Sequence, residues 1–296
     1  GTGLIGRALS DELLDNGHQV VVLSRNPARA APMPKGVEVL RWDARTPHGW
    51  GAAVEEIDAV VNLAGESLPT GPITRERKRR VLSSRLNVGH ALVEAIAKAD
   101  HKPKVLVQAS GIGYYGDGGD DILTEAAPPG SDWFAGVAVK WENATADVEQ
   151  YGVRRVIIRT GLVLSDEGGI LTPLTLPLKL YVGGHFGNGR QYMPWIHIDD
   201  EVGAIRFLLE QDEADGPYNL SSPNPVTNAD LYQVLGEVMH RPTWLPVPSW
   251  SLRLVLGDMA PLLLSGQRAV PERLEELGYP FRYRHLRDAA EDLLAS

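Results

Sequence analysis

The sequence predicts an α/β protein: a doubly wound parallel sheet followed by a smaller, mostly helical C-terminal lobe. Three observations predict it. A glycine-rich turn at residues 1–6 opens an amphipathic helix. Short, continuous runs of β-branched residues then alternate with helical patterns up to about residue 165, as is typical of strands covered on both faces. After that point proline and glycine become frequent, and residues 222–296 are mostly helical in pattern.

Each element follows from a local pattern. The first helix begins at Leu4, because apolar residues recur at helical spacing, and it ends at Asn16-Gly17, a typical helix end. A further strand–helix–strand unit is expected near residues 195–220. Repeated βα units of this kind make a doubly wound fold. The other strands are expected at 20–23, 37–40, 59–63, 105–107 and 155–158, and the helices at about 49–56, 74–99 and 133–150.

These patterns divide the chain into two lobes. Residues 1–165 plus 193–221 are expected to form a nucleotide-binding lobe of the Rossmann type. Residues 166–192 plus 222–296 are expected to form the smaller, substrate-side lobe from discontinuous segments.

Composition excludes several classes of protein. The 296 residues, enough for a full core, include 29 basic and 38 acidic residues, a formal net charge of −9 that argues against a nucleic-acid partner. No apolar stretch of about 18 residues occurs, so no membrane partner is expected. With 0 cysteines the chain cannot form disulfides or thiolate metal sites. No leader pattern is present either, so we expect a cytoplasmic protein.

The glycine turn is a candidate dinucleotide site. Gly3 and Gly6 have the spacing of the last two glycines in a G-x-x-G-x-x-G turn, where backbone N–H groups approach a pyrophosphate at a helix N-terminus. The alternative is an ordinary tight turn. The helix that follows leads into a strand with a polar end, which favours the dinucleotide. The candidate contacts are Gly1, Thr2, Gly3, Leu4, Ile5 and Gly6.

The next strand predicts which dinucleotide binds. It ends at Ser24 and Arg25. An acidic residue here would bind the ribose hydroxyl of NAD, whereas an arginine accommodates the 2′-phosphate of NADP. The guanidinium fork suits a phosphate, and Ser24 adds a hydroxyl donor. A solvated arginine at a strand end is the alternative, but beside the glycine turn the pair predicts NADP(H).

Two further strand ends extend this site. Asp43 follows the strand at 37–40, and its carboxylate can accept a hydrogen bond from the adenine amino group. Leu63, Ala64 and Gly65 follow the strand at 59–63, and small residues at this edge let a cofactor lie across the sheet. The alternative for Ala64 and Gly65 is a plain turn.

Several motifs together resemble a known family. The chain is similar to the extended short-chain dehydrogenase/reductases, in the NAD-dependent epimerase/dehydratase superfamily. Within it the chain resembles an atypical branch called epimerase family proteins, some of which are labelled SulA-like cell-division inhibitors. The branch name supplies no substrate. The motifs that carry the resemblance are residues 1–6, 62–66, 84–85, 113–116, 140–142, 159–164, 187–191, 194–200 and 266–268.

The resemblance implies further features of the cofactor site. Arg85 of the Ser84-Arg85 pair is expected near the cofactor, and Val163 is expected to contact it. Family members carry a strand and one more glycine before the position of Gly1. We therefore expect about seven further residues, forming a central first strand, in the native protein.

The resemblance also raises a question about catalysis. Working superfamily members use a Ser or Thr, with a Tyr and a Lys in Tyr-x-x-x-Lys. Lys140 matches the lysine, but Gly136 stands at the tyrosine position. The usual hydroxyl position is Gly111, and Ser110 lies one residue away, where a strand side chain points to the opposite face.

Three hypotheses follow for the chemistry. Tyr114 or Tyr115 substitutes as proton donor, with Lys140 and Ser110 as the other candidate catalytic residues. Alternatively, the protein binds NADP(H) without superfamily chemistry, as a regulatory or cell-division-related protein. In the third, hydride passes to an electron-poor substrate and water supplies the proton. Aromatic packing beside the cofactor is the competing interpretation of both tyrosines, and a plain surface lysine that of Lys140.

The remaining constellations are less specific. The glycine-rich segment 183–195 matches the family's substrate-side loop, so Arg190, Gln191 and Trp195 are predicted to contact an unknown small-molecule substrate; a linker between lobes is the alternative. His197 and Asp199 lack an evident third ligand, so no metal is expected, and Asp199 is expected to cap the next helix. Superfamily members often pair helices, so a homodimer through residues 74–99 and 133–150 is a possible assembly, provided that Arg75–Arg80 stay at its rim.

Overall fold

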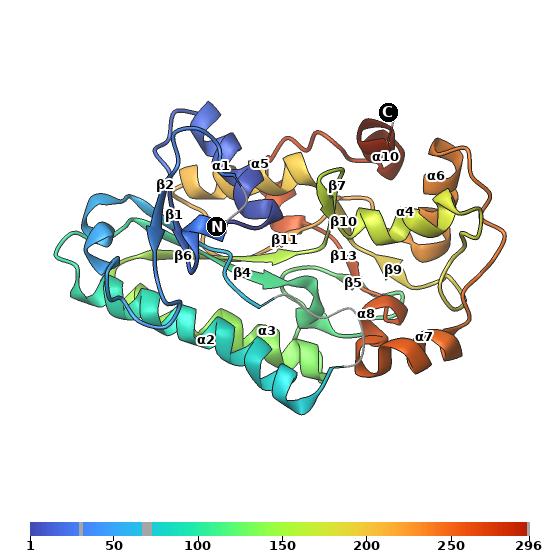
Figure 1. Ribbon diagram of the computed structural model, residues 1–296, viewed down its shortest axis with the longest axis horizontal. Helices are drawn as coiled ribbons and strands as arrows, with labels where there is room; N and C mark the ends of the chain where they lie inside the picture. The colour runs from blue at the N-terminus through green and yellow to red at the C-terminus, as the bar shows by residue number, and fades with distance from the viewer. Residues whose placement is uncertain (30–31, 67–72, 295–296) are drawn as a thin grey trace.

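The fold is built around a central parallel sheet. The computed structural model describes residues 1–29, 32–66 and 73–294. Four parallel strands lie in the order β11-β6-β4-β3, and β1 and β2 form a separate parallel pair (Figure 1). All five strands expected before residue 165 are confirmed. These five are β1 Val21–Ser24, β2 Glu38–Arg41, β3 Ala59–Asn62, β4 Val105–Gly111 and β6 Arg154–Thr160, and the later strand β11 is Gly216–Leu220.

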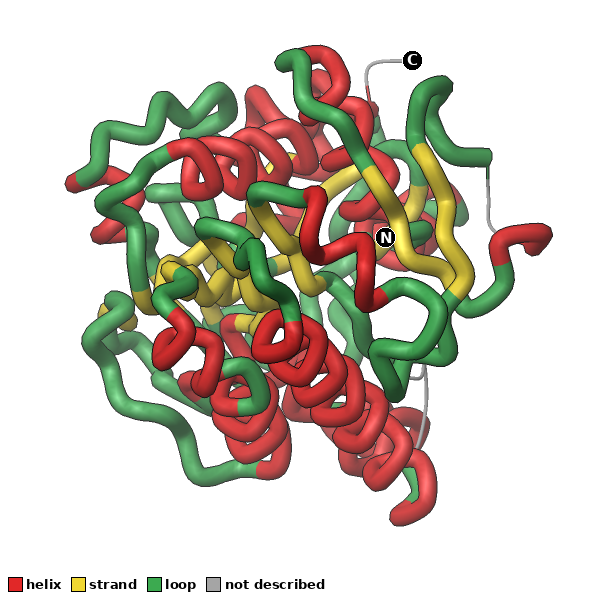
Figure 2. Tube along the Cα trace, turned by 90° about the vertical axis from the view of Figure 1, so that its left-hand side faces the viewer, coloured by secondary structure: helices red, strands yellow, loops and turns green. Residues whose placement is uncertain are grey.

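Helices cover both faces of this sheet, which confirms the doubly wound α/β class. On one side α1 packs against α5, and on the other side α2 packs against α3 (Figures 1 and 2). The strand interiors are apolar because both faces are covered, and β4 is buried along nearly its whole length. The four helices are α1 Leu4–Asp15, α2 Arg75–Lys98, α3 Trp133–Asn143 and α5 Ile198–Glu210.

Two of the expected helices differ in the structure. The pattern at 133–150 is two elements, since α3 ends at Asn143 and a 3₁₀ helix, η4, covers Ala146–Tyr151. The helix expected at 49–56 is the short 3₁₀ helix η2, Gly51–Glu56. Short 3₁₀ segments of this kind are common as connectors between longer elements.

The C-terminal part is mostly helical, as predicted, and has its own apolar core. Buried side chains of α4, α6 and α10 pack around Trp195 and Met193. The lobe boundaries stay a prediction. The helices are α4 Leu171–Lys179, α6 Asn228–Val238, α7 Ser249–Leu256, α8 Pro261–Leu264, α9 Glu272–Glu276 and α10 Leu286–Leu294, and the short strands are β5 Ile122–Leu123, β7 Leu162–Ser165, β8 Gly168–Gly169, β9 Tyr192–Met193, β10 Trp195–His197, β12 Val226–Thr227 and β13 Arg268–Ala269.

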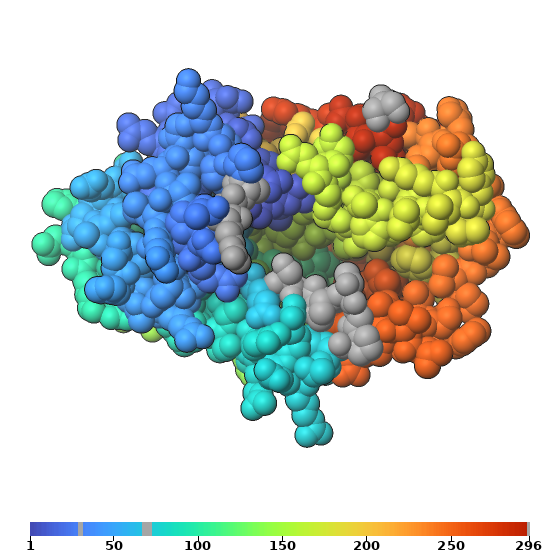
Figure 3. Space-filling view, in the orientation of Figure 1, coloured from blue at the N-terminus to red at the C-terminus, as the bar shows by residue number. Residues whose placement is uncertain are grey.

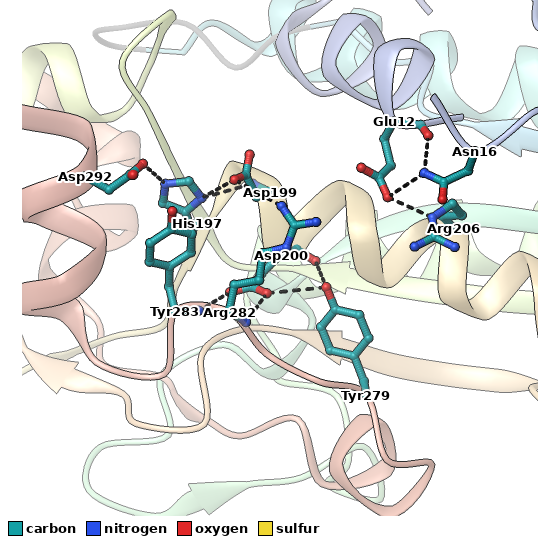
Figure 4. A network of polar contacts seen from close by, with 10 residues as sticks. All are labelled: Glu12, Asn16, His197, Asp199, Asp200, Arg206, Tyr279, Arg282, Tyr283 and Asp292. Atoms are coloured by element: carbon teal, nitrogen blue, oxygen red, sulfur yellow. Dashed lines mark hydrogen bonds and ion pairs between the residues drawn. The ribbon is translucent and has the colours of Figure 1, made fainter. Parts of the chain in front are cut away.

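The first turn of α5 anchors the end of the chain (Figure 4). Asp200 is fully buried, and its carboxylate accepts the backbone N–H groups of Arg282 at 2.8 Å and Tyr283 at 2.9 Å. The Tyr279 hydroxyl donates to the Asp200 carbonyl at 3.1 Å. A buried carboxylate needs such donors, so this one aspartate ties residues 279–283 to the sheet lobe.

His197 caps α5, which corrects the expectation that Asp199 does so. The Nδ1 atom of His197 accepts the Asp199 N–H at 3.1 Å, so Asp199 lies inside the first turn. The Nε2 atom lies 3.2 Å from Asp292 of α10, and the imidazole stacks on Tyr283 with centroids 3.9 Å apart (Figure 4). Across the described residues, no three His, Asp or Glu side chains converge as metal ligands.

Candidate functional site

A cleft of about 360 Å³ opens at the carboxyl edge of the sheet, beside the N-terminus of α1. Figure 3 shows this face of the molecule hollowed between the N-terminal segments in blue and the segments drawn in yellow-green and orange. The cleft brings together predicted cofactor residues that are far apart in the chain. Those that line it are Gly1, Gly3, Leu4, Ile5, Gly6, Leu63 and Val163.

The first turn of α1 fits an anion. The first intrahelical bond runs from the Arg7 N–H to the Gly3 carbonyl at 2.9 Å, so the N–H groups of Leu4 to Gly6 have no intrahelical acceptor. Among the described residues, no side chain caps this turn. A Cβ at Gly6 would lie 2.2 Å from the Gly1 carbonyl oxygen, so only glycine lets the turn close. Free N–H groups at the positive end of a helix dipole are a phosphate site.

Ser24 and Arg25 lie at the end of β1. Arg25 is exposed and makes no ion pair with any described residue. The Ser24 side chain is buried, and its Oγ accepts the Asn26 N–H at 3.3 Å, which leaves the hydroxyl hydrogen free to donate. Arg25 is therefore open to an anionic ligand, whereas Ser24 is buried, and neither residue is among those that line the cleft.

Asp43 forms a local turn. Its carboxylate accepts the N–H of Arg45 at 2.7 Å and both the N–H and the hydroxyl of Thr46, each at 2.8 Å. These hydrogen bonds lower the pKa of the exposed Asp43 carboxyl. The carboxylate is thus occupied by local donors. Its contact with the adenine amino group stays a prediction.

Arg85 holds the loop after β3. Its guanidinium donates to the carbonyl oxygens of Glu66 and Val81, both at 3.0 Å, and lies 4.5 Å from the centroid of the Trp141 ring. Burial lowers the pKa of Arg85 to about 10, against the opposing charge of Glu66. A Cβ at Gly65 would lie 3.1 Å from this guanidinium. Arg85 therefore positions the Leu63–Gly65 loop beside the cleft rather than lining it.

Ser110 belongs to a buried network beneath the sheet edge. Its hydroxyl donates to Glu142 of α3 at 2.7 Å. The same carboxylate accepts two hydrogen bonds from Arg159, at 2.9 and 3.0 Å. Glu142 and Arg159 expose only 7% and 4% of their side chains, so this is an internal ion pair. The Ser110 hydroxyl is therefore paired in the interior, which does not support its predicted catalytic role.

Tyr115 is part of the same network. Its hydroxyl donates to Asn219 Oδ1 at 2.7 Å and accepts from Arg159 at 3.0 Å. Burial raises the pKa of Tyr115 to about 12, although Arg159 opposes the shift. A hydroxyl with two buried partners and a raised pKa is a poor proton donor, so the predicted catalytic role of Tyr115 is not supported either.

Tyr114 and Lys140 remain accessible. Tyr114 is half-buried, and its ring centroid lies 3.4 Å from the guanidinium carbon of Arg159. Lys140 is exposed on α3, one turn after the exposed Gly136. A Cβ at Gly136 would meet no described atom within 4 Å, so this helix face is open where the superfamily carries its tyrosine.

Two of the predicted substrate residues are structural. Trp195 is fully buried, and its indole N–H donates to the Asn224 carbonyl at 3.3 Å. The buried Gln191 amide donates to the carbonyls of Phe186 and Leu263, at 3.1 and 2.9 Å. Both assignments are corrected, because these polar atoms join chain segments. Arg190 is 79% exposed and lies 3.8 Å from Asp120, so it alone of the three is free to contact a ligand.

Glu201 is a residue that the sequence analysis missed. It is fully buried on α5, accepts the Thr160 hydroxyl at 2.8 Å through Oε1, and has no described partner at Oε2. Burial raises its pKa to about 8. Thr160 pairs in register with Gly111, and Gly161 lines the cleft. The sequence did contain a signal for this residue, because Glu201 lies on the apolar face of the helix that carries Ile198 and Ile205.

A glycine turn at a helix N-terminus, facing a cleft at the carboxyl edge of a parallel sheet, defines a dinucleotide-binding α/β protein. More specifically, the chain belongs to the NAD dependent epimerase/dehydratase family, whose sequence profile matches residues 1–221. Residues 247–293 match a domain of unknown function, DUF1731.

Named relatives confirm the resemblance to the epimerase family protein branch. Epimerase family protein YfhF of Bacillus subtilis is 38% identical over 300 residues, which cover 100% of this chain and 96% of that protein. Mouse epimerase family protein SDR39U1 is 36% identical, over 100% of this chain and 98% of its own length. The crystal structure of human SDR39U1 with NADPH is 33% identical and has a TM-score of 0.89, covering 100% of this chain and 97% of that one.

A more distant structure shares the fold. The NAD complex of Thermus thermophilus UDP-glucose 4-epimerase has a TM-score of 0.76 at 19% identity, and covers 99% of this chain and 96% of that one.

Proposed function

We propose that this protein binds NADP(H) and acts as an epimerase-like oxidoreductase on a small molecule. The observation that carries the proposal is the uncapped first turn of α1 at the cleft, with the free donors of Ser24 and Arg25 at the neighbouring strand end. The NADPH in the human relative, 33% identical over the whole chain, supports the same cofactor.

The residues divide the binding task by chemistry. The N–H groups of Leu4 to Gly6 would hold the pyrophosphate, and Arg25 with Ser24 would hold the 2′-phosphate. Leu63 and Val163 would supply apolar walls of the cleft. When bound, NADP(H) supplies hydride transfer.

Proton transfer and substrate binding rest on a few accessible side chains. Tyr114 and Lys140 are the side chains left for proton transfer, because the hydroxyls of Ser110 and Tyr115 are paired in the interior. Arg190 would bind a carboxylate or phosphate of the substrate.

An equilibrium titration with NADPH and NADH tests this proposal. Wild-type protein should bind NADPH more tightly than NADH. Arg25→Ala should weaken NADPH binding by roughly tenfold to a hundredfold, since it removes a charged hydrogen bond, and leave NADH nearly unchanged. Arg79→Ala, an exposed arginine on α2, is the matched control and should bind as the wild type does. Equal losses for both cofactors in Arg25→Ala would contradict the assignment.

A second candidate is a non-catalytic NADP(H)-binding protein with a regulatory or cell-division-related role. The observation that favours it is the internal pairing of Ser110 and Tyr115, together with Gly136 at the tyrosine position. NADPH that binds tightly but is not oxidised with aldehydes, ketones or nucleotide sugars would favour this candidate. Gly136→Tyr tests it further, because a Cβ at this position meets no described atom within 4 Å.

A further inference from the structure

Large exposed apolar side chains gather at one end of the C-terminal lobe. Of the large apolar residues that the described chain exposes, all except Val21 and Ile122 lie at this end. These residues fall in two segments, at the end of α4 and from the approach to α7 through that helix. Together they form what we call the apolar end surface: Leu176, Leu180, Tyr181, Val182, Trp244, Leu245, Trp250, Leu254 and Val255.

Helix α7 projects its apolar side chains outward. Every residue of Ser249–Leu256 is exposed or half-buried. Trp250 and Leu254 lie one turn apart on the same face and expose 69% and 78% of their surfaces. The end of the helix is held from its other side, where Leu256 packs against the cluster around Met259. The apolar face of α7 that carries Trp250 and Leu254 therefore points outward, whereas a core helix turns its apolar face inward.

The two segments lie side by side. The Leu245 N–H donates to the Gly183 carbonyl at 3.1 Å, and the Val247 N–H donates to the His185 carbonyl at 2.8 Å. The Arg241 guanidinium carbon lies 4.7 Å from the Tyr181 ring centroid. In Figure 1 the end of α4 and the stretch that leads into α7 lie at the same right-hand end of the molecule.

The charge of these segments is one-sided. Residues 168–198 and 238–257 contain no Asp or Glu, although the whole chain has a net charge of −9. Their charged residues are all cations, Lys179, Arg190, Arg241 and Arg253, although Arg190 lies 3.8 Å from Asp120 and Asp258 follows the second segment directly. A second copy of the chain seated on this surface would bring like charges together, which is unfavourable. A negatively charged partner fits instead.

We propose that the apolar end surface docks on a membrane surface that contains anionic phospholipids. Exposed Trp and Tyr side chains suit the headgroup level, and protruding Leu side chains reach the acyl boundary. The adjacent Arg and Lys side chains attract lipid phosphates. Peripheral docking needs no membrane-spanning helix, and no helix in the described part of the chain is long and apolar enough to be one. The proposal therefore amends the expectation of no membrane partner.

Vesicle co-sedimentation of the full chain tests the proposal. The probes are vesicles of phosphatidylcholine alone and of equal parts phosphatidylcholine and phosphatidylglycerol. Wild-type protein should bind the anionic vesicles, and salt should weaken that binding. The double variant Trp250→Ala/Leu254→Ala should bind at least about tenfold more weakly, and Arg253→Glu should weaken binding by roughly tenfold. Ile122→Ala, an apolar residue 58% exposed elsewhere, is the matched control and should bind normally.

Folding is checked by the thermal midpoint, which should be unchanged because the substituted residues are exposed. Equal binding to both kinds of vesicle, no binding, or binding that both surface variants retain would overturn the proposal. Sedimentation velocity without vesicles tests whether a second copy of the chain occupies the apolar end surface. A wild-type dimer that the double variant converts to a monomer would show that a second copy occupies the surface, and would overturn the lipid assignment.

Discussion

Two neighbouring regions at the carboxyl edge of the sheet use polar groups in opposite ways. At the first turn of α1 the polar groups are backbone N–H donors without intrahelical acceptors, and they face the cleft. Beneath β4 and β6 the polar groups are side chains that pair with one another in the interior, around Arg159. The first region is therefore available to a ligand, whereas the second stabilises the fold.

The largest expected effect comes from breaking the internal network. Arg159→Met leaves the buried Glu142 carboxylate unpaired and should lower the free energy of unfolding by about 3–5 kcal/mol. Urea denaturation measures this loss. Arg287→Met, which breaks a surface pair with Glu237, should cost at most about 1 kcal/mol. A similar small loss for Arg159→Met would mean that the network contributes little to stability.

Glu201 lies between the two regions, and its test is pH dependence. Burial raises the pKa of the folded protein's carboxyl to about 8, above that of the unfolded chain, so the folded state favours the protonated form. Stability should therefore fall as pH rises from about 5 to 8, by up to about 1.4 kcal/mol per pH unit from this group. Glu201→Gln should remove that slope in denaturation measured across this range. The exposed Glu272→Gln should retain it, and identical slopes in all three proteins would refute the assignment.

Gln191 tests whether the corrected substrate loop is structural. Gln191→Ala removes the side-chain donor to the Leu263 carbonyl and one of the two donors to the Phe186 carbonyl, which also accepts the Gly189 N–H at 3.0 Å, and should lower the unfolding free energy by about 1–2 kcal/mol. Arg190→Ala, next to it but exposed, should change stability by less than about 0.5 kcal/mol. Thermal unfolding compares the two variants. The reverse order of losses would contradict the structural role of Gln191.

The smallest expected effect is a gain in stability. Gly136→Ala fills open space on the exposed face of α3 and should raise the unfolding free energy by about 0.5–1 kcal/mol, since alanine favours a helix over glycine. The same change at Gly89 of α2 should destabilise the protein, because its Cβ would lie 2.7 Å from the Ala144 Cβ. Chemical denaturation of both variants measures the two signs, and equal signs would contradict the described packing.

The sequence predicted the features in which the residue type itself determines the backbone conformation. The strands, the helix after the glycine turn and the cleft residues Gly1 and Gly3 to Gly6 follow from glycine and β-branched patterns, and the structure confirms the elements. It could not predict which way Gln191 and Trp195 point, because an amide or an indole has the same identity whether it pairs inside or faces a ligand. For Ser110, strand alternation already indicated the opposite face, but its partner Glu142 could not be predicted because it lies on a distant helix.

The anchoring of the chain end by Asp200 has a consequence for the order of folding. The carboxylate lies at the start of α5, but the backbone donors that satisfy it belong to Arg282 and Tyr283, 82 and 83 residues later in the chain. The Asp200 carboxylate therefore lacks these backbone donors until the segment around residues 279–283 packs against α5. A protein truncated before Tyr279 would keep that acid without donors, so the nucleotide-binding lobe completes its interior only when the C-terminal segment arrives.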